Sequence, residues 1–349
     1  MENKILMEDM ENIFNRGYEW NRFDGKRFLI SGAYGMLASY IIYFLMYLNI
    51  EKNISVQVIA QGKNKKKAEK RFSRYWGHPD FQFINADILD RNESLPHIDY
   101  IIHAASWANP RYYSTNPVEV IEPNTLGTYH LLKIALQHRS EGFLFFSSGD
   151  IYGQVCGNND IMEETLGCMD PLDLHSCYGE SKRLGETLCS AFYKEYGVRT
   201  VIARVGHTYG PTMDVENDPR VFAGFMKNAL EDDDIVLYSD GSAQRPFCYI
   251  ADATAAFMLL LLNGNGGEAY NVTNTSQFLS IKELAEIIAS LPDKKLKVTF
   301  AGRDTADTYL NNSLNRANKP VEYKLMKLGW EHQFGAEQGF ERVYRSLKK

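Results

Sequence analysis

A glycine-rich stretch near the amino terminus constrains the fold more than any other part of the sequence. Residues 31–38 read Ser-Gly-Ala-Tyr-Gly-Met-Leu-Ala, between an apolar run at 27–30 and an apolar run of helical length at 39–48. A strand, a glycine turn and a helix start in this order build a diphosphate site, because the free N–H groups at the helix start attract an anion. Gly32 permits the sharp turn, and Gly35 lets a phosphate approach the backbone. An ordinary βα turn is the alternative until other residues join the motif.

The first two thirds of the chain alternate strands with helices. Further strands are predicted at 54–60, 81–85, 99–103, 142–147 and 199–205, and a long helix at 178–196. This alternation predicts an α/β fold with a doubly wound parallel sheet of the Rossmann type. After residue 205 the elements become shorter and mixed, which predicts a smaller α/β lobe that binds substrate over the carboxyl ends of the strands.

These patterns divide the chain into three parts. We expect a helical extension over 1–24, a dinucleotide-binding domain over 25–205, and a substrate-binding lobe with a helical tail over 206–349, with some crossing of the chain between lobes. Apolar residues at helical spacing between positions 5 and 14 predict the helix of the extension.

Composition narrows the classes of function. The net charge of −6 argues against general nucleic-acid binding. The longest apolar stretch, 40–48, is too short to span a bilayer, and the acidic amino terminus lacks the apolar core of a signal peptide. The chain has five cysteines but no Cys-x-x-Cys pair, which fits a reducing cytoplasm and gives no metal site.

Tyr178 and Lys182 form the pair that points most directly to catalysis. They lie four residues apart, on one face of the predicted helix. A lysine ammonium near a phenol favours the phenolate, which would make the tyrosine a usable base near neutral pH. The pairs at 323/327 and 344/348 have the same spacing, so spacing alone decides nothing.

The strand that precedes this helix distinguishes the pair Tyr178–Lys182 from the other two pairs. Ser148 is expected at the carboxyl end of the fifth strand, where its hydroxyl can bond a substrate oxygen beside Tyr178. Asp150 follows it as a possible acid or base, with a turn cap as the alternative.

Together these features resemble the extended short-chain dehydrogenase/reductase superfamily, and within it the NAD-dependent nucleotide-sugar epimerases, dehydratases and decarboxylases. The resemblance runs from about residue 26 to about 330. Its motifs are matched by Asp87-Ile88, by His103-Ala104-Ala105, by residues 124–128, by Tyr209-Gly210-Pro211 and by Arg245.

The resemblance implies roles for particular residues. Catalysis falls to Tyr178, Lys182, Ser148 and Asp150, and substrate binding to Ser106, Ser148, His207 and Arg245, of which Arg245 holds the diphosphate. Cofactor contacts are implied for Gly32, Tyr34, Gly35, Met36, Leu37, Lys63, Asp87, Ile88, Ala104, Ala105, Asn124, Tyr178 and Lys182. The implied partners are a nucleotide-sugar substrate and a second copy of the chain in a homodimer.

The resemblance points to NAD as the cofactor, but one position departs from the NAD pattern. The second strand ends in a lysine cluster, Lys63 and residues 65–67, where NAD-binding folds usually carry an acid. Such a cluster could hold the 2′-phosphate of NADP, and a solvated helix start is the alternative interpretation.

The implied reaction begins with hydride transfer at sugar C4, Tyr178 taking the hydroxyl proton. Epimerisation at C4 needs the fewest further groups and is our main prediction. Residues 175–183 and the Arg245 segment resemble UDP-glucuronate decarboxylases, so decarboxylation is the first alternative and NAD(P)H-dependent reduction of a 4-keto sugar the second.

Three positions depart from the related enzymes. Asp150 replaces a glutamate, His207 replaces an asparagine, and Gly149 stands where dehydratases carry an acid, which disfavours dehydration. A non-catalytic cofactor-binding regulator is the alternative from another class, and the intact Ser148, Tyr178 and Lys182 argue against it.

Overall fold

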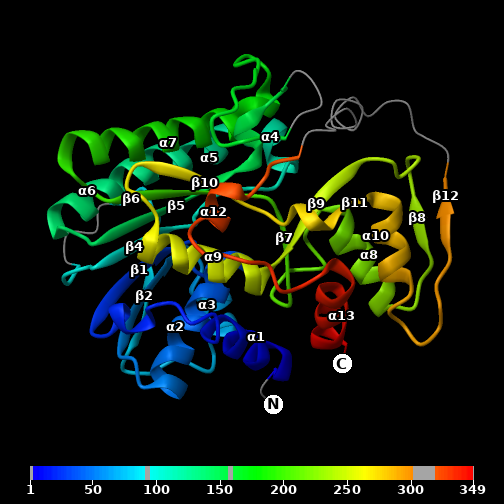
Figure 1. Cartoon of the computed structure of the whole chain (residues 1–349), viewed down its shortest axis with the longest axis horizontal. Helices are drawn as coiled ribbons and strands as arrows, with labels where there is room; N and C mark the ends of the chain where they lie inside the picture. Colours follow the sequence, from blue (N-terminus) through cyan, green and yellow to red (C-terminus); the bar gives the residue numbers. More distant parts are fainter. Residues whose placement is uncertain (1–2, 91–94, 156–159, 302–318, 349) are drawn as a thin grey trace.

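A seven-stranded parallel sheet forms the centre of the molecule in this computed structural model, which describes residues 3–90, 95–155, 160–301 and 319–348 (Figure 1). The strand order is β10-β6-β5-β4-β1-β2-β3. The strands are β1 (Lys26–Ser31), β2 (Val56–Gly62), β3 (Phe81–Asn85), β4 (Tyr100–His103), β5 (Gly142–Ser148), β6 (Thr200–Val205) and β10 (Glu268–Val272). The order reverses between β1 and β4, so the predicted doubly wound α/β fold is confirmed.

Helices cover both faces of this sheet. On one face lie α2 (Met36–Lys52) and α9 (Ile250–Asn263), with α3 (Lys65–Arg71) near the β3 edge, and on the other α5 (Pro117–Glu122), α6 (Thr128–His138) and α7 (Cys177–Tyr196). Neighbouring strand residues divide between the two layers: Phe28 and Ile30 pack toward α2 and α9, and Leu29 packs toward α6 and α7. Burial on both faces explains why these strands read as continuous apolar runs.

A smaller lobe extends from the carboxyl edge of the sheet. It contains the three-stranded sheet β11-β9-β7 and the two-stranded sheet β12-β8. Its elements are β7 (His207–Tyr209), α8 (Val221–Leu230), β8 (Ile235–Leu237), β9 (Gln244–Tyr249), β11 (Phe278–Ser280), α10 (Ile281–Ala289) and β12 (Val298–Phe300). Helix α10 is capped at its N-terminus, where Ser280 and Glu283 form a reciprocal capping box.

The chain returns to the large sheet after entering the smaller lobe. Helix α9 and strand β10 belong to the sheet layers although both follow residue 205. The proposed domain boundary at residue 205 stays a prediction. The chain crosses from the smaller lobe back to the large sheet at the junction of β9 and α9. The terminal elements are α1 (Lys4–Phe14), which matches the predicted helix, the short α12 (Tyr323–Met326), and α13 (Ala336–Leu347).

The helical segment that follows Asn116 is interrupted. A π-helical turn at Pro123–Gly127 separates α5 from α6. Proline has no N–H to donate, and the Pro123 carbonyl accepts a hydrogen bond from His103 Nε2 at 2.9 Å. A tertiary contact thus takes an acceptor that a regular helix would use, and π turns of this kind are frequent at functional sites.

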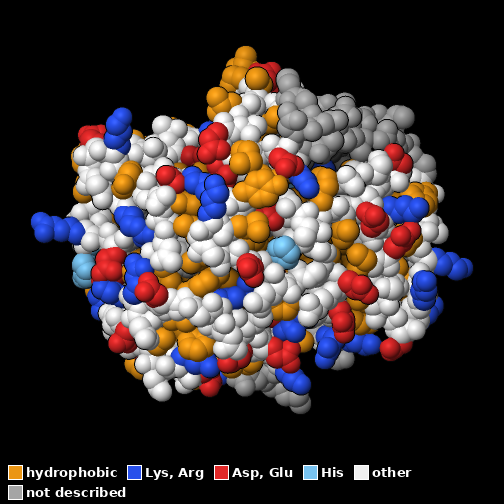
Figure 2. All heavy atoms as spheres, in the orientation of Figure 1, with side chains coloured by type: hydrophobic (Ala, Val, Ile, Leu, Met, Phe, Trp, Pro, Cys, Tyr) orange, Lys and Arg blue, Asp and Glu red, His pale blue; other side chains and the backbone are white. Residues whose placement is uncertain are grey.

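The surface carries mixed charge. Figure 2 shows Lys and Arg side chains interspersed with Asp and Glu over the visible face. None of the helices in the described ranges is long and apolar enough to cross a membrane. The cysteines within these ranges, Cys168, Cys177, Cys189 and Cys248, are free.

Candidate functional site

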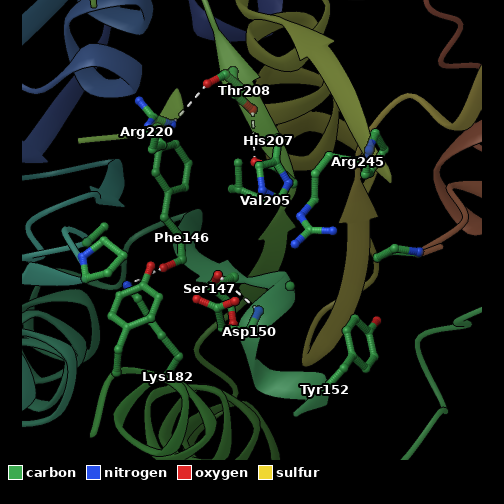
Figure 3. Close-up of a pocket in the computed structure, with 18 of the residues that line it drawn as sticks. Phe146, Ser147, Asp150, Tyr152, Lys182, Val205, His207, Thr208, Arg220 and Arg245 are labelled. Carbon is green, nitrogen blue, oxygen red and sulfur yellow. Dashed lines mark hydrogen bonds between the residues drawn. The ribbon is translucent and has the colours of Figure 1, made fainter. Parts of the chain in front are cut away.

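A cavity of about 650 Å³ opens between the sheet and the smaller lobe. Its floor is the carboxyl end of β5 and β6, which is where ligands bind in open α/β sheets. Met36 and Leu37, in the first turn of α2, line the cavity, and so does Arg245 of β9, which is labelled in Figure 3. Both lobes therefore contribute to a single site.

The glycine turn has the geometry that a diphosphate needs. Gly32 adopts a φ of +64°, and a Cβ added there would lie 2.7 Å from the backbone of Ala105, so only glycine fits. Gly35 is the N-cap of α2 and supplies no side-chain cap. The N–H groups of the first turn of α2 are therefore left for an anionic ligand.

A buried relay ties this turn to the segment after β4. His103 is buried, which lowers its pKa to about 3, so the ring is neutral. Its Nε2 donates to the Pro123 carbonyl, and its Nδ1 accepts from the Ser31 hydroxyl at 2.8 Å. Ser31 Oγ then accepts from the backbone N–H groups of Ala104 and Ala105 at 3.2 and 3.3 Å. The relay fixes Ala104 and Ala105, which were predicted to line the cofactor, but these hydrogen bonds were not predicted.

The lysine cluster behaves as the start of a helix. Residues 65–67 are exposed in the first turn of α3, whose N-cap is Asn64. Lys63 forms an ion pair of 2.8 Å with Asp87, and that hydrogen bond raises the pKa of Lys63. Partial burial opposes ionisation of Asp87, but Lys63 and backbone N–H groups together lower its pKa. The Lys63 charge is therefore already paired with a carboxylate.

Tyr178 and Lys182 are both buried in the first two turns of α7. Lys182 Nζ donates to the Phe146 carbonyl at 2.6 Å and lies 5.6 Å from the centre of the Tyr178 ring. Burial lowers the pKa of Lys182 to about 7, against the opposing effect of Glu186. Burial also raises the pKa of Tyr178. At a pH high enough to ionise the phenol, Lys182 is therefore already neutral. The expectation that Lys182 alone makes Tyr178 a base near neutral pH is not borne out for the protein without cofactor.

Several side chains surround the Tyr178 hydroxyl. The Asp150 carboxylate adds to the rise in the pKa of Tyr178, whereas Ser148, Arg220 and Ser106 lower it. Ser148 Oγ also accepts from the Asp150 backbone N–H at 3.1 Å, and this fixes the turn after β5. Ser106 lines the cavity beside Tyr178, and its hydroxyl oxygen is buried.

Two contributors to the site were not predicted. The ring of Tyr113, from α4 (Arg111–Thr115), stacks on the Tyr178 ring with centroids 5.1 Å apart and an interplanar angle of 11°. Arg220 lines the cavity, is held by Asp218 through Nε at 2.9 Å, and donates to the Thr208 carbonyl at 3.2 Å. An arginine beside an aspartate, shortly after the Tyr-Gly-Pro segment, was the available signal for Arg220.

The smaller lobe supplies the opposite wall. His207 begins β7 and Arg245 lies in the neighbouring β9, where His207 pairs with Phe247. Figure 3 shows Arg245 extending from β9 toward the segment of Ser147 and Asp150. Two arginines thus enter the same cavity as the tyrosine and the lysine.

The structure brings most predicted site residues together. The cavity is lined by Met36, Leu37, Ala104, Ser106, Ser148, Asp150, Tyr178, Lys182, His207 and Arg245. The other predicted cofactor residues, Gly32, Tyr34, Gly35, Lys63, Asp87, Ile88, Ala105 and Asn124, are not part of its lining. They belong to the glycine turn, to the segments that follow β2, β3 and β4, and to the π turn. Tyr323 and Tyr344, which share the four-residue spacing to a lysine, do not line the cavity.

Comparisons with known proteins agree with this arrangement. The NAD dependent epimerase/dehydratase family model matches residues 28–273. The chain belongs to this family, which confirms the predicted fold, enzyme class and NAD as cofactor.

Curated relatives and a solved structure give the similarity in more detail. UDP-glucuronic acid decarboxylase 3 of Arabidopsis thaliana is 30% identical over 314 residues, covering 90% of this chain and 86% of that protein. UDP-glucuronic acid decarboxylase 1 of Xenopus tropicalis is 29% identical over 348 residues, covering 98% and 78%. A UDP-glucuronic acid 4-epimerase variant of Bacillus cereus, crystallised with NAD and a fluorinated UDP-glucuronic acid, shares the fold with a TM-score of 0.76, 22% identity and coverage of 91% and 98%.

The glycine turn yields a first prediction. We expect Gly32→Ala to abolish measurable NAD binding, because its Cβ would meet the Ala105 backbone and push the turn away from the ligand. Gly25→Ala is the matched control: Gly25 has a similar φ of +72°, but nothing lies within 4 Å of its added Cβ. Both variants carry similar backbone strain, so both should lose thermal stability, and Gly32→Ala should lose more because its Cβ also meets backbone atoms; only Gly32→Ala should lose NAD binding in calorimetric titration. Equal NAD affinity in the two variants would contradict the assignment.

Proposed function

We propose that this chain is a decarboxylase of a nucleoside diphosphate-linked uronic acid, with UDP-glucuronate as the first substrate to test. The observation that carries the proposal is the placement of Arg220 and Arg245 in one cavity with Tyr178 and Lys182. A uronic acid on a diphosphate has two separate anionic groups, and a guanidinium suits each. Similarity over most of the chain to UDP-glucuronic acid decarboxylases supports the same substrate class.

We assign the two arginines different tasks. Arg245, on the wall made by the smaller lobe, holds the diphosphate. Arg220 lowers the pKa of the Tyr178 hydroxyl, so its charge acts on the oxygen that takes the proton of the sugar C4 hydroxyl. The C6 carboxylate is two carbons from C4, and Arg220 is our candidate for binding it.

The residues present fit NAD as the group that carries the hydride. The glycine turn offers the diphosphate cradle, and the Ser31–His103 relay fixes Ala104 and Ala105. When bound there, NAD supplies the hydride acceptor and donor at sugar C4. Lys63, already paired with Asp87, gives no support to a 2′-phosphate.

The protein groups handle protons and charge. Tyr178, ionised, takes the proton of the C4 hydroxyl while Ser148 holds that oxygen and the protonated Lys182 balances the charge. The product of this oxidation is a β-keto acid. Its C5–C6 bond breaks, carbon dioxide leaves, and the electron pair moves to the C4 oxygen, where the hydroxyls of Tyr178 and Ser148 donate. C5 then takes a proton, which we assign to Asp150. The C4 ketone would regain the hydride from the bound cofactor while Tyr178 returns its proton to the C4 oxygen, which leaves the UDP-pentose.

Epimerisation at C4, our main prediction from the sequence, uses the same first step. It differs in keeping the C5–C6 bond and returning the hydride to the other sugar face. The likeness to the Bacillus cereus 4-epimerase concerns the fold alone, whereas the relatives at about 30% identity are decarboxylases. We therefore place decarboxylation first.

Product analysis tests this function. Purified protein with NAD and UDP-glucuronate should release carbon dioxide and form a UDP-pentose, identified by mass spectrometry. Tyr178→Phe should keep the fold and NAD binding but lower the rate on the order of 10²–10⁴, as expected when a positioned base is removed. Tyr323→Phe and Tyr344→Phe are the controls and should be near wild type.

Two other outcomes would contradict the proposal. Formation of UDP-galacturonate without release of carbon dioxide would make epimerisation the activity. A Tyr178→Phe variant with the wild-type rate would show that the catalytic tyrosine was assigned wrongly.

We also propose a homodimer formed through α5, α6 and α7. Exposed apolar side chains gather on these neighbouring helices: Val118, Ile121, Leu126, Tyr129, Leu184, Tyr193 and Tyr196. A second copy can cover this surface with the same surface, as in a twofold interface. We expect a dimer in sedimentation analysis, and Leu126→Glu combined with Leu184→Glu to shift it to monomer with the fold intact. A monomeric wild-type protein would contradict this arrangement.

A further inference from the structure

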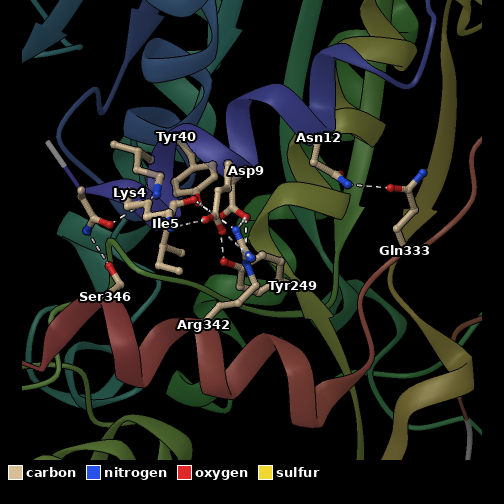
Figure 4. Close-up of polar contacts among 12 residues, drawn as sticks. Lys4, Ile5, Asp9, Asn12, Tyr40, Tyr249, Gln333, Arg342 and Ser346 are labelled. Atoms are coloured by element: carbon tan, nitrogen blue, oxygen red, sulfur yellow. Dashed lines mark hydrogen bonds and ion pairs between the residues drawn. The ribbon is translucent and has the colours of Figure 1, made fainter.

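The amino-terminal extension places one carboxylate deep in the protein. Asp9 of α1 is fully buried, and every polar group that contacts it is a donor (Figure 4). Asp9 Oδ2 accepts from the hydroxyls of Tyr40, in α2, and Tyr249, at the end of β9, the latter at 2.6 Å. Asp9 Oδ1 accepts from Arg342 of α13, through Nε at 3.0 Å and Nη2 at 2.6 Å. One side chain therefore joins four separate elements.

This cluster tolerates little change in geometry. A buried carboxylate is stable only while its charge is balanced and its oxygens are bonded, and loss of one partner leaves an uncompensated charge. Here Arg342 balances the charge, and two tyrosine hydroxyls complete the bonding of Oδ2. The planar guanidinium, bonded through two nitrogens, also fixes direction. Helices α1, α2 and α13 and the end of β9 are therefore held in one relative placement.

The place where the cluster meets β9 gives it a functional meaning. Tyr249 is the last residue of β9, and Ile250 begins α9, so the chain passes here from the smaller lobe to the layer under the large sheet. Four residues before Tyr249, the same strand carries Arg245. At about 3.3 Å per residue, roughly 13 Å of extended strand separates Tyr249 from Arg245, the residue that we propose binds the diphosphate. The neighbouring strand pairs Tyr209 with Tyr249 and carries His207 two residues earlier.

A second buried ion pair holds the other side of this junction. Arg16, just after α1, pairs with Asp252 in the first turn of α9. Asp252 also accepts from the backbone N–H groups of Gln333 and Phe334 at 3.0 and 3.1 Å. The extension and the carboxyl-terminal segment thus form hydrogen bonds and ion pairs with the chain both at the end of β9 and at the start of α9.

We propose that Tyr249, held by Asp9 and Arg342, is a positioning residue that sets the smaller-lobe wall of the site against Tyr178. Through β9 it places Arg245, and through the pairing with β7 it places His207. The extension is then part of the substrate-binding machinery, although none of its residues in the described range 3–24 lines the cavity. The inference rests on the proposed role of Arg245 in nucleotide-sugar binding.

Tyr249→Phe and Tyr40→Phe form a matched pair that tests this role. Each removes one buried hydroxyl that donates to the same oxygen, Asp9 Oδ2, but only Tyr249 lies on β9. The measurements are thermal stability, amide hydrogen exchange of peptides covering residues 244–249, and the affinities for UDP and for NAD. Arg245→Ala shows how much UDP binding depends on the arginine itself.

The proposal predicts a selective effect. Both Phe variants should lose similar thermal stability, but only Tyr249→Phe should speed exchange in residues 244–249 and weaken UDP binding by about tenfold, with NAD affinity unchanged. Equal exchange of this segment in the two variants would overturn the proposal, and so would an equal loss of UDP and NAD affinity in Tyr249→Phe.

Two further variants keep the result unambiguous. If Tyr249→Phe fails to fold, Arg342→Lys, which keeps the charge but loses the two-nitrogen contact, carries the same predictions. If Arg245→Ala leaves UDP binding unchanged, the proposed role of Arg245 fails, while the exchange of residues 244–249 still decides whether Tyr249 holds β9.

Discussion

The site depends on a conflict between burial and charge at Tyr178 and Lys182. Both side chains are buried, and burial opposes the charged form of each: it raises the pKa of the phenol and lowers that of the ammonium to about 7. Lys182 donates to the Phe146 carbonyl, and the Glu186 carboxylate opposes the fall in its pKa. A tyrosinate and a lysine ammonium formed together would balance each other, and we propose that the pair ionises as a unit once a ligand fills the cavity.

The surrounding structure holds the groups that such a ligand meets. On the dinucleotide side, the Ser31–His103 relay and the glycine turn fix backbone N–H groups without using a charged side chain. On the substrate side, ion pairs fix the groups that the ligand meets: Asp218 orients Arg220, and the Asp9 cluster anchors the strand of Arg245. Neutral contacts leave the cofactor side free to bind an anion, whereas buried ion pairs fix the direction of the opposite wall.

Much of the fold could be predicted because its signals are local. Alternating apolar runs and glycines mark the strands and turns of a parallel sheet, and Ser280 with Glu283 marks a helix start within four residues. The Tyr178–Lys182 pair could be separated from its two counterparts only because Ser148 ends a strand just before it. The resemblance to a family supplied the remaining site residues.

The features that the sequence did not reveal depend on distant contacts. The π turn needs His103 to reach Pro123, the ring stack needs α4 to place Tyr113 on Tyr178, and Asp9 meets Arg342 across almost the whole chain. No spacing rule connects such residues. The lowered pKa of Lys182 was not predicted either. The four-residue spacing in the sequence shows that Lys182 can lie near Tyr178, but it does not show that Lys182 is buried.

Titration of Tyr178 tests the central claim most directly. The phenol can be followed by nuclear magnetic resonance of carbon-labelled tyrosine, assigned by the signal lost in Tyr178→Phe. The account predicts that Tyr178 titrates above the ordinary tyrosine range in the free protein and that its pKa falls when NAD is added, because the oxidised nicotinamide ring adds a positive charge. It would be contradicted if the free protein showed an ordinary or lowered pKa at Tyr178, or if NAD left that pKa unchanged.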